Sequence, residues 1–261
     1  MFRALSALFV FIGLTPIASA QRPLLFLGDE MGELPVLTRF LSDAGYAVRE
    51  ATQEAPLPEL VDFESVVVYI HEPLLERVET ALIDYARKGG RLLVLHHALA
   101  SAKLRNPKWL EFLGIALFPR DDPNHPWLVS GEVTHIMVNL APGHWITTHG
   151  VKYDRRVDYH STTRPRYRGR FDAFDLPNTE VFHNQRFTDG DSKTILFGYL
   201  LEGEAAAALP ANVPSSEETG GWFKKTGDGL VFYLQPGHTA DDFRNRSFRR
   251  VILNCLSWRG E

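Results

Sequence analysis

The stretch Arg91-Leu-Leu-Val-Leu-His96-His97 indicates the fold class of this chain. Its apolar run is typical of a strand in a parallel sheet, because such strands are buried on both faces. Two other apolar runs also end in histidine, and these are Val66-Val-Val-Tyr-Ile-His71 and Leu230-Val-Phe-Tyr-Leu-Gln-Pro-Gly-His238. Open α/β sheets bind ligands beyond the carboxyl ends of their strands, so the three runs predict a site at that edge of a sheet.

Strand and helix patterns alternate through the first third of the chain. Strands are expected at residues 23–27, 46–48, 65–70 and 91–95, and helices at residues 34–44 and 73–88. This order predicts an α/β fold with a doubly wound, mostly parallel sheet flanked by helices.

The middle of the chain is richer in strand patterns than in helix patterns. Strands are expected at residues 133–140, 179–184 and 194–200, a short helix at 106–114, and loops at 118–130 and 209–221. A strand at residues 230–234 and a closing helix at 247–258 return to the α/β pattern. Because no linker composition interrupts the chain, we expect one domain over residues 21–261 with a β-rich insertion in its middle.

Residues 1–20 have the features of a signal peptide. Arg3 provides the positive charge, residues 5–14 the apolar core, and Ala18-Ser19-Ala20 the small residues of a cleavage site. The apolar core is short for a membrane span. We therefore expect cleavage after Ala20, a periplasmic or secreted protein, and no stable membrane anchor. An N-terminal anchor or a buried first helix is the alternative.

Charge and cysteine content exclude some classes of function. The formal net charge of −4 gives no general attraction for nucleic acid, and Asp172 and Asp175 dilute the basic cluster at residues 164–170, which is expected to be a loop. We therefore expect no nucleic-acid partner. Cys255 is the only cysteine, so the chain can form no internal disulfide. Its place in an amphipathic helical pattern predicts a small core residue rather than a nucleophile.

The histidines are the main candidates for chemistry, because an imidazole near pH 7 can bind a metal, carry a proton or donate a hydrogen bond. We predict that His97 or His96 acts with His238 as general acid/base or as metal ligand. Gly237 permits a tight turn that presents His238. Adjacent side chains in an extended segment point to opposite faces, so only one of His96 and His97 is expected to face the pocket.

Carboxylates accompany the histidines at the predicted sheet edge. Asp158, Glu72 and Asp29 are candidates to orient an imidazole or complete a metal shell. Asp29 and Glu72 equally fit the roles of turn residue and helix cap. No compact metal-binding spacing is present, so the sequence names no metal, and a divalent ion stays an open option.

Four tryptophans fall in or near predicted loops: Trp109, Trp127, Trp145 and Trp222. Flat aromatic faces suit sugar rings, and binding pockets combine such faces with a few polar groups. We predict that Trp222, beside two glycines in an expected covering loop, forms a wall of the substrate pocket. Ordinary core packing is the alternative for each tryptophan.

Three motifs together resemble the ThuA-like (trehalose utilisation) family. They are Gly89-Gly-Arg-Leu-Leu-Val-Leu-His-His-Ala98, His144-Trp-Ile-Thr-Thr-His-Gly150, and residues 221–238 followed by the helix that ends in Trp258. The resemblance spans residues 23–258 and implies a fold similar to class I glutamine amidotransferases and flavodoxin-like domains. Where the family often has an acidic Asp-Glu-Leu-Tyr-like element, this chain has residues 154–160, and Asp158 and Tyr159 fill part of that role.

The resemblance also implies a link to sugar metabolism. One prediction is an exported carbohydrate-active hydrolase, isomerase or lyase with a His-based, optionally metal-assisted, acid/base site for a carbohydrate or keto-sugar derivative. Trp222, Asp29, Glu72 and Tyr159 would then bind the substrate. The alternative is a non-catalytic glycan-binding or accessory module of a carbohydrate-utilisation system. A degenerate amidotransferase is disfavoured, because the only cysteine lies in a helical pattern.

Overall fold

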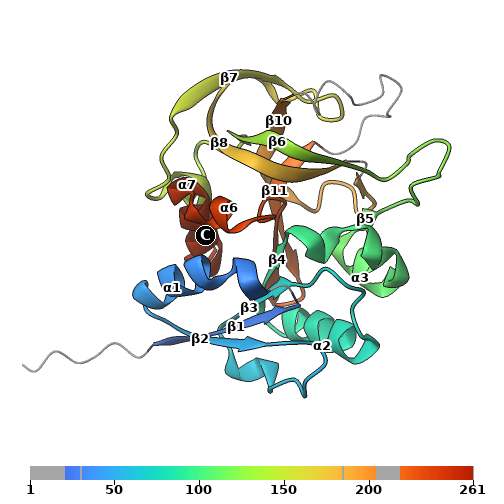
Figure 1. Cartoon of the computed structure of the whole chain (residues 1–261), viewed down its shortest axis with the longest axis vertical. Helices are drawn as coiled ribbons and strands as arrows, with labels where there is room; N and C mark the ends of the chain where they lie inside the picture. Colours follow the sequence, from blue (N-terminus) through green and yellow to red (C-terminus); the bar gives the residue numbers. More distant parts are fainter. Residues whose placement is uncertain (1–20, 30, 184, 204–217, 261) are drawn as a thin grey trace, which may run out of the picture.

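The computed structural model describes residues 21–29, 31–183, 185–203 and 218–260. The expected signal peptide lies outside these residues. A ten-stranded sheet forms the centre of the described structure (Figure 1). Its strands are β1 (Arg22–Gly28), β2 (Tyr46–Ala51), β3 (Ser65–Tyr69), β4 (Arg91–Leu95), β6 (Leu128–Asn139), β7 (Arg155–His160), β8 (Arg168–His183), β10 (Thr194–Glu202), β11 (Thr219–Thr226) and β12 (Gly229–Leu234).

The strands follow the order β2-β1-β3-β4-β12-β11-β10-β6-β8-β7. A separate two-stranded ribbon pairs β5 (Ile115–Ala116) with β9 (Arg186–Phe187). The helices are α1 (Pro35–Asp43), α2 (Glu76–Arg87), α3 (Pro107–Leu113), α4 (Trp145–Thr148), α6 (Ala240–Arg244) and α7 (Arg246–Ser257), and the 3-10 helices are η1 (Met31–Glu33), η2 (Leu60–Asp62), η3 (His96–Leu99) and η4 (Ser101–Arg105). No helix among the described residues has the length and apolar character needed to cross a membrane.

The predicted parallel sheet is confirmed in one half of the structure. Strands β2, β1, β3, β4 and β12 pair in parallel. Neighbouring residues of β4 belong to different hydrophobic clusters, one on each face of the sheet. Leu92 lies in the cluster that includes α2 and α3, and Leu93 lies in the cluster that includes α1 and α7. Helices therefore cover both faces of the sheet (Figure 1), which explains why these strands are apolar throughout.

The predicted β-rich insertion is also confirmed, and its strands continue the same sheet. Strands β11, β10, β6, β8 and β7 pair antiparallel beyond β12. The strands are longer than expected, because β6 begins at Leu128 and β8 at Arg168, in segments predicted as loops. Pairing with a neighbouring strand fixes these polar segments in extended form. A loop was predicted at residues 209–221. Residues 209–217 lie outside the described residues, and residues 219–221 belong to β11.

Local signals near the ends of the helices hold in the structure. Gly114 ends α3 in the left-handed conformation, as its position after the helical pattern suggested.

Cys255 lies fully buried on α7, and burial raises the pKa of its thiol. Its position confirms the prediction of a small core residue.

Candidate metal centre

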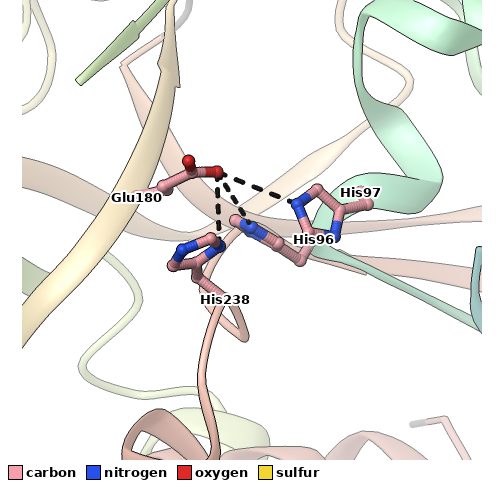
Figure 2. A group of neighbouring side chains, drawn as sticks. All are labelled: His96, His97, Glu180 and His238. Carbon is pink, nitrogen blue, oxygen red and sulfur yellow. Dashed lines mark ion pairs between the residues drawn. The ribbon is translucent and has the colours of Figure 1, made fainter. Parts of the chain in front are cut away.

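Three histidines and one glutamate converge beyond the carboxyl ends of β4 and β12 (Figure 2). His96 and His97 begin η3 directly after β4, His238 follows β12, and Glu180 lies on β8. One potential ligand atom from each residue lies within 4.8 Å of those from the others. We call these four residues the His–Glu cluster.

Both neighbouring histidines face the cluster, so the prediction that only one would do so is wrong. Opposite orientation holds for an extended strand, but the strand ends at Leu95 and the chain turns into η3. His96 has a φ of 43°, and the ring centroids of His96 and His97 lie 4.1 Å apart. The turn therefore brings two adjacent imidazoles to the same side.

The distances from Glu180 to the three imidazoles are close to the spacing of metal ligands. Glu180 Oε2 lies 3.7 Å from His96 Nε2, 3.8 Å from His97 Nε2 and 3.3 Å from His238 Nδ1. Good hydrogen bonds between nitrogen and oxygen are shorter than this. Zinc binds nitrogen and oxygen ligands at about 2.1 Å, which separates neighbouring tetrahedral ligands by about 3.4 Å. Figure 2 shows the three imidazoles directed toward the Glu180 carboxylate.

The charge states of the cluster also suit a cation. Burial on its own would raise the pKa of the Glu180 carboxyl, but the three imidazoles hold that pKa well below its usual range. Burial lowers the pKa of His96 to about 4, so this imidazole is neutral at pH 7. Its Nδ1 lies 2.7 Å from the Gln235 carbonyl oxygen, and this hydrogen bond orients the ring with Nε2 toward the cluster.

A buried carboxylate fixes two members of the cluster relative to each other. Asp242 Oδ2 accepts hydrogen bonds from the Thr179 hydroxyl at 2.6 Å and from the amides of Gly237 at 3.0 Å and His238 at 2.9 Å. Thr179 precedes Glu180 on β8. Asp242 therefore connects the strand that carries Glu180 to the turn that carries His238.

We predict that Asp242→Ala lowers the affinity for Zn²⁺ by about 10- to 100-fold, the range found when groups that orient metal ligands are removed. Asp242→Asn retains an accepting oxygen and should restore most of the affinity. The matched control is Asp241→Ala, because Asp241 is exposed and pairs with Arg244. Calorimetric titration measures the affinities, and the absorption spectrum of bound Co²⁺ reports the ligand geometry. An unaltered affinity and spectrum in Asp242→Ala would refute this role.

The predicted site residue Asp29 lies beside the cluster and supports the end of β3. Its carboxylate accepts hydrogen bonds from the amides of His71 at 2.7 Å and Glu72 at 2.8 Å. The fully buried Lys103 donates to the carbonyls of Ile70, His71, Glu72 and His97 at 2.8–3.2 Å. These bonds hold the His71 ring stacked on His97, with centroids 4.3 Å apart. The structure therefore agrees with the alternative interpretation of Asp29, that of a turn residue.

The other predicted site residues lie outside the cluster. Glu72 is exposed. Asp158 is exposed on β7, the outermost strand, and Tyr159 is buried there, where its hydroxyl donates to the Glu218 carbonyl at 3.2 Å. Trp222 is fully buried within β11, where it packs on Tyr233. Its predicted place in a covering loop is wrong, because strand pairing on both sides encloses it.

Glu180 was missing from the sequence-based candidates. It lies inside a segment that was correctly predicted as a strand, where a glutamate is ordinarily expected on the solvent face. The break at Pro177-Asn178 is the one local signal, because proline interrupts strand pairing at bulges. That signal marks an irregularity of the strand and does not identify its partners.

A cavity of about 470 Å³ adjoins the cluster. Its lining residues are Gly131, Glu132, Asn178, Glu180, His238 and Thr239. Two of the four cluster residues therefore form part of its wall. A ligand in this cavity would have access to the cluster from solvent.

The fold is similar to solved structures of low sequence identity. A protein described as ThuA-like from Parabacteroides merdae has a TM-score of 0.63 at 14% identity, covering 92% of this chain and 90% of that chain. Another described as ThuA-like, from Bacteroides uniformis, has a TM-score of 0.58 at 14% identity and 95% coverage of both chains. A glutamine amidotransferase from Thermotoga maritima has a TM-score of 0.52 at 8% identity, covering 92% and 100%.

These likenesses establish the predicted fold, which ThuA-like and glutamine amidotransferase-like proteins share. Among curated proteins, none matches this chain. The family model described as ThuA, trehalose utilisation, matches residues 29–259. This match covers nearly the whole chain and includes all four residues of the His–Glu cluster, so the chain belongs to the ThuA family.

Proposed function

We propose that this chain is an exported enzyme that binds a divalent transition-metal ion at the His–Glu cluster and acts on a carbohydrate or keto-sugar derivative. The observation that carries the proposal is the set of three imidazole nitrogens at 3.3–3.8 Å from one carboxylate oxygen. The family's description as trehalose utilisation supports a carbohydrate substrate. The signal-peptide pattern of residues 1–20 supports export.

A bound divalent ion would polarise a carbonyl or hydroxyl oxygen of the substrate. The ionised Glu180 offsets part of the cationic charge, and His96 offers its neutral Nε2. The adjoining cavity admits the substrate to this point. The exposed ring of His71, stacked on His97, is placed to accept or donate a proton as general acid/base. Polarising a carbonyl acidifies the neighbouring C–H bond, so isomerisation or elimination of a keto-sugar fits this arrangement, and hydrolysis also fits.

Metal analysis followed by activity measurement tests the proposal. The purified protein, stripped with a chelator and titrated with Zn²⁺, Mn²⁺ or Co²⁺, should bind one ion per chain. Loaded protein should convert at least one member of a panel of keto-sugars and glycosides that stripped protein leaves unchanged. Metal binding and sugar binding without turnover would favour the glycan-binding alternative. Failure to bind any of the three ions would refute the metal centre.

A further inference from the structure

The described backbone has three non-glycine residues at positive φ, and all three lie at the His–Glu cluster or in the wall of the adjoining cavity. They are His96 at 43°, Glu132 at 54° and Asn178 at 56°. In this left-handed region the Cβ atom of a side chain raises the conformational free energy of the backbone, and glycine, which has no Cβ, avoids this strain. Such strain concentrates at sites where the position of the side chain has a use.

An irregularity shared by β6 and β8 places Glu132 and Asn178 in the cavity wall. The register between these strands shifts between Ser130 and Val133, and again between Val133 and His135. Bulges of this kind redirect side chains beside functional sites. Both Glu132 and Asn178 are exposed, and the same cavity is bounded by Glu180 and His238.

The lining that the described residues form is polar and contains no lysine or arginine. A carboxylate accepts hydrogen bonds from hydroxyl groups, and a carboxamide both donates and accepts them. Neighbouring hydroxyl groups on one ligand can therefore be bound by Glu132 and Asn178 together. A carboxylate or phosphate placed at the Glu132 end of the cavity would lie against the negative charge of Glu132, with no lysine or arginine among the described lining residues to pair with it.

We propose that Glu132 and Asn178 form a subsite that binds an uncharged polyhydroxylated ligand beside the metal centre and disfavours its anionic counterparts. The inference rests on the proposed function, because it takes the cavity to be the substrate's place at the cluster. According to this proposal, Glu132 and Asn178 determine the selectivity of the site for neutral over acidic sugars.

Glucose and glucuronate are suitable probes, since they differ by a hydroxymethyl group and a carboxylate at one position. Calorimetry or ligand-observed NMR would measure both dissociation constants with Zn²⁺-loaded and metal-free protein. Metal-free wild-type protein should bind glucose about tenfold more tightly than glucuronate, because no bound cation then attracts the carboxylate and one unfavourable charged contact with Glu132 remains. Glu132→Gln should narrow this ratio, and Glu50→Gln, on the distant edge strand β2, should leave it unchanged.

Substitution by glycine separates ligand binding from folding. Glu132→Gly and Asn178→Gly remove the side chain at positions where glycine relieves backbone strain, so the thermal midpoint should stay the same or rise. Each should still weaken glucose binding about tenfold, as expected for lost hydrogen bonds, with an unaltered Zn²⁺ affinity.

Three results would overturn the subsite: unaltered glucose binding in both glycine variants, tighter binding of glucuronate by metal-free wild-type protein, or binding of neither sugar by Zn²⁺-loaded wild-type protein. Wild-type protein that binds glucose selectively but no metal would instead refute the metal centre and support the subsite.

Discussion

Glu180→Gln is expected to abolish tight metal binding while the protein stays folded. Glu180 is the only anionic member of the His–Glu cluster, and its Oε2 is the atom that approaches all three imidazoles. Glutamine has nearly the same size but presents a neutral amide to the cation. The affinity for Zn²⁺ should fall by about 100-fold or more, since losing groups that only orient ligands already costs 10- to 100-fold.

Calorimetric titration with Zn²⁺ measures this effect, and the absorption spectrum of Co²⁺-loaded protein gives a second readout. The side chain of Glu180 is 25% exposed, so its replacement leaves no hole in the core. Glu50→Gln is the matched control, because Glu50 is exposed on β2 at the other end of the sheet. Equal Zn²⁺ affinities in Glu180→Gln and wild-type protein would show that the cluster is not the metal site.

Gly229→Ala is expected to destabilise the fold by about 3 kcal/mol or more, the upper range for forcing extra atoms into a packed interior. Gly229 begins β12, and a Cβ there would overlap the carbonyl oxygens of Ala86 and Gly90. Both are backbone atoms, at the end of α2 and before β4, so no side chain can rotate away. The start of β12 would have to move from its neighbour β4.

Urea unfolding of metal-free protein, followed by circular dichroism, measures the loss. Gly143→Ala provides the control, because a Cβ at Gly143 would meet nothing within 4 Å. Its free energy of unfolding should change by less than about 0.5 kcal/mol, as for an ordinary surface substitution. The same unfolding midpoint in Gly229→Ala and wild-type protein would mean that β12 does not pack this closely on α2.

Much of the parallel half of the sheet was predictable because its signals are local. A buried parallel strand such as residues 91–95 is apolar at every position, and glycine after an amphipathic pattern marks the end of a helix. Three of the four cluster residues lie within four positions of the carboxyl end of such a strand. Their position at the sheet edge therefore follows from the order of elements.

Glu180 could not be placed in the same way. Its strand β8 is separated from β12 in the sheet by β11, β10 and β6, yet its carboxylate lies 3.3 Å from His238. The register shifts between β6 and β8 fall next to Glu180, and the hydrogen bonds of Asp242 connect this part of β8 to the turn that carries His238. Neither feature is visible in the residues around Glu180, because both depend on contacts between distant segments.

The sequence by itself determined the α/β fold and the histidines at the carboxyl edge, because hydrophobic periodicity and turn residues act over a few positions. Its motifs also showed the resemblance to the family. Only the tertiary structure decided which polar side chains meet. In the structure, His96 and His97 face the same side and Glu180 joins them in the cluster. Trp222 is buried in the core, and Asp158 is exposed on the outermost strand. Convergence of this kind is set by long-range strand pairing and packing, which a single sequence does not display.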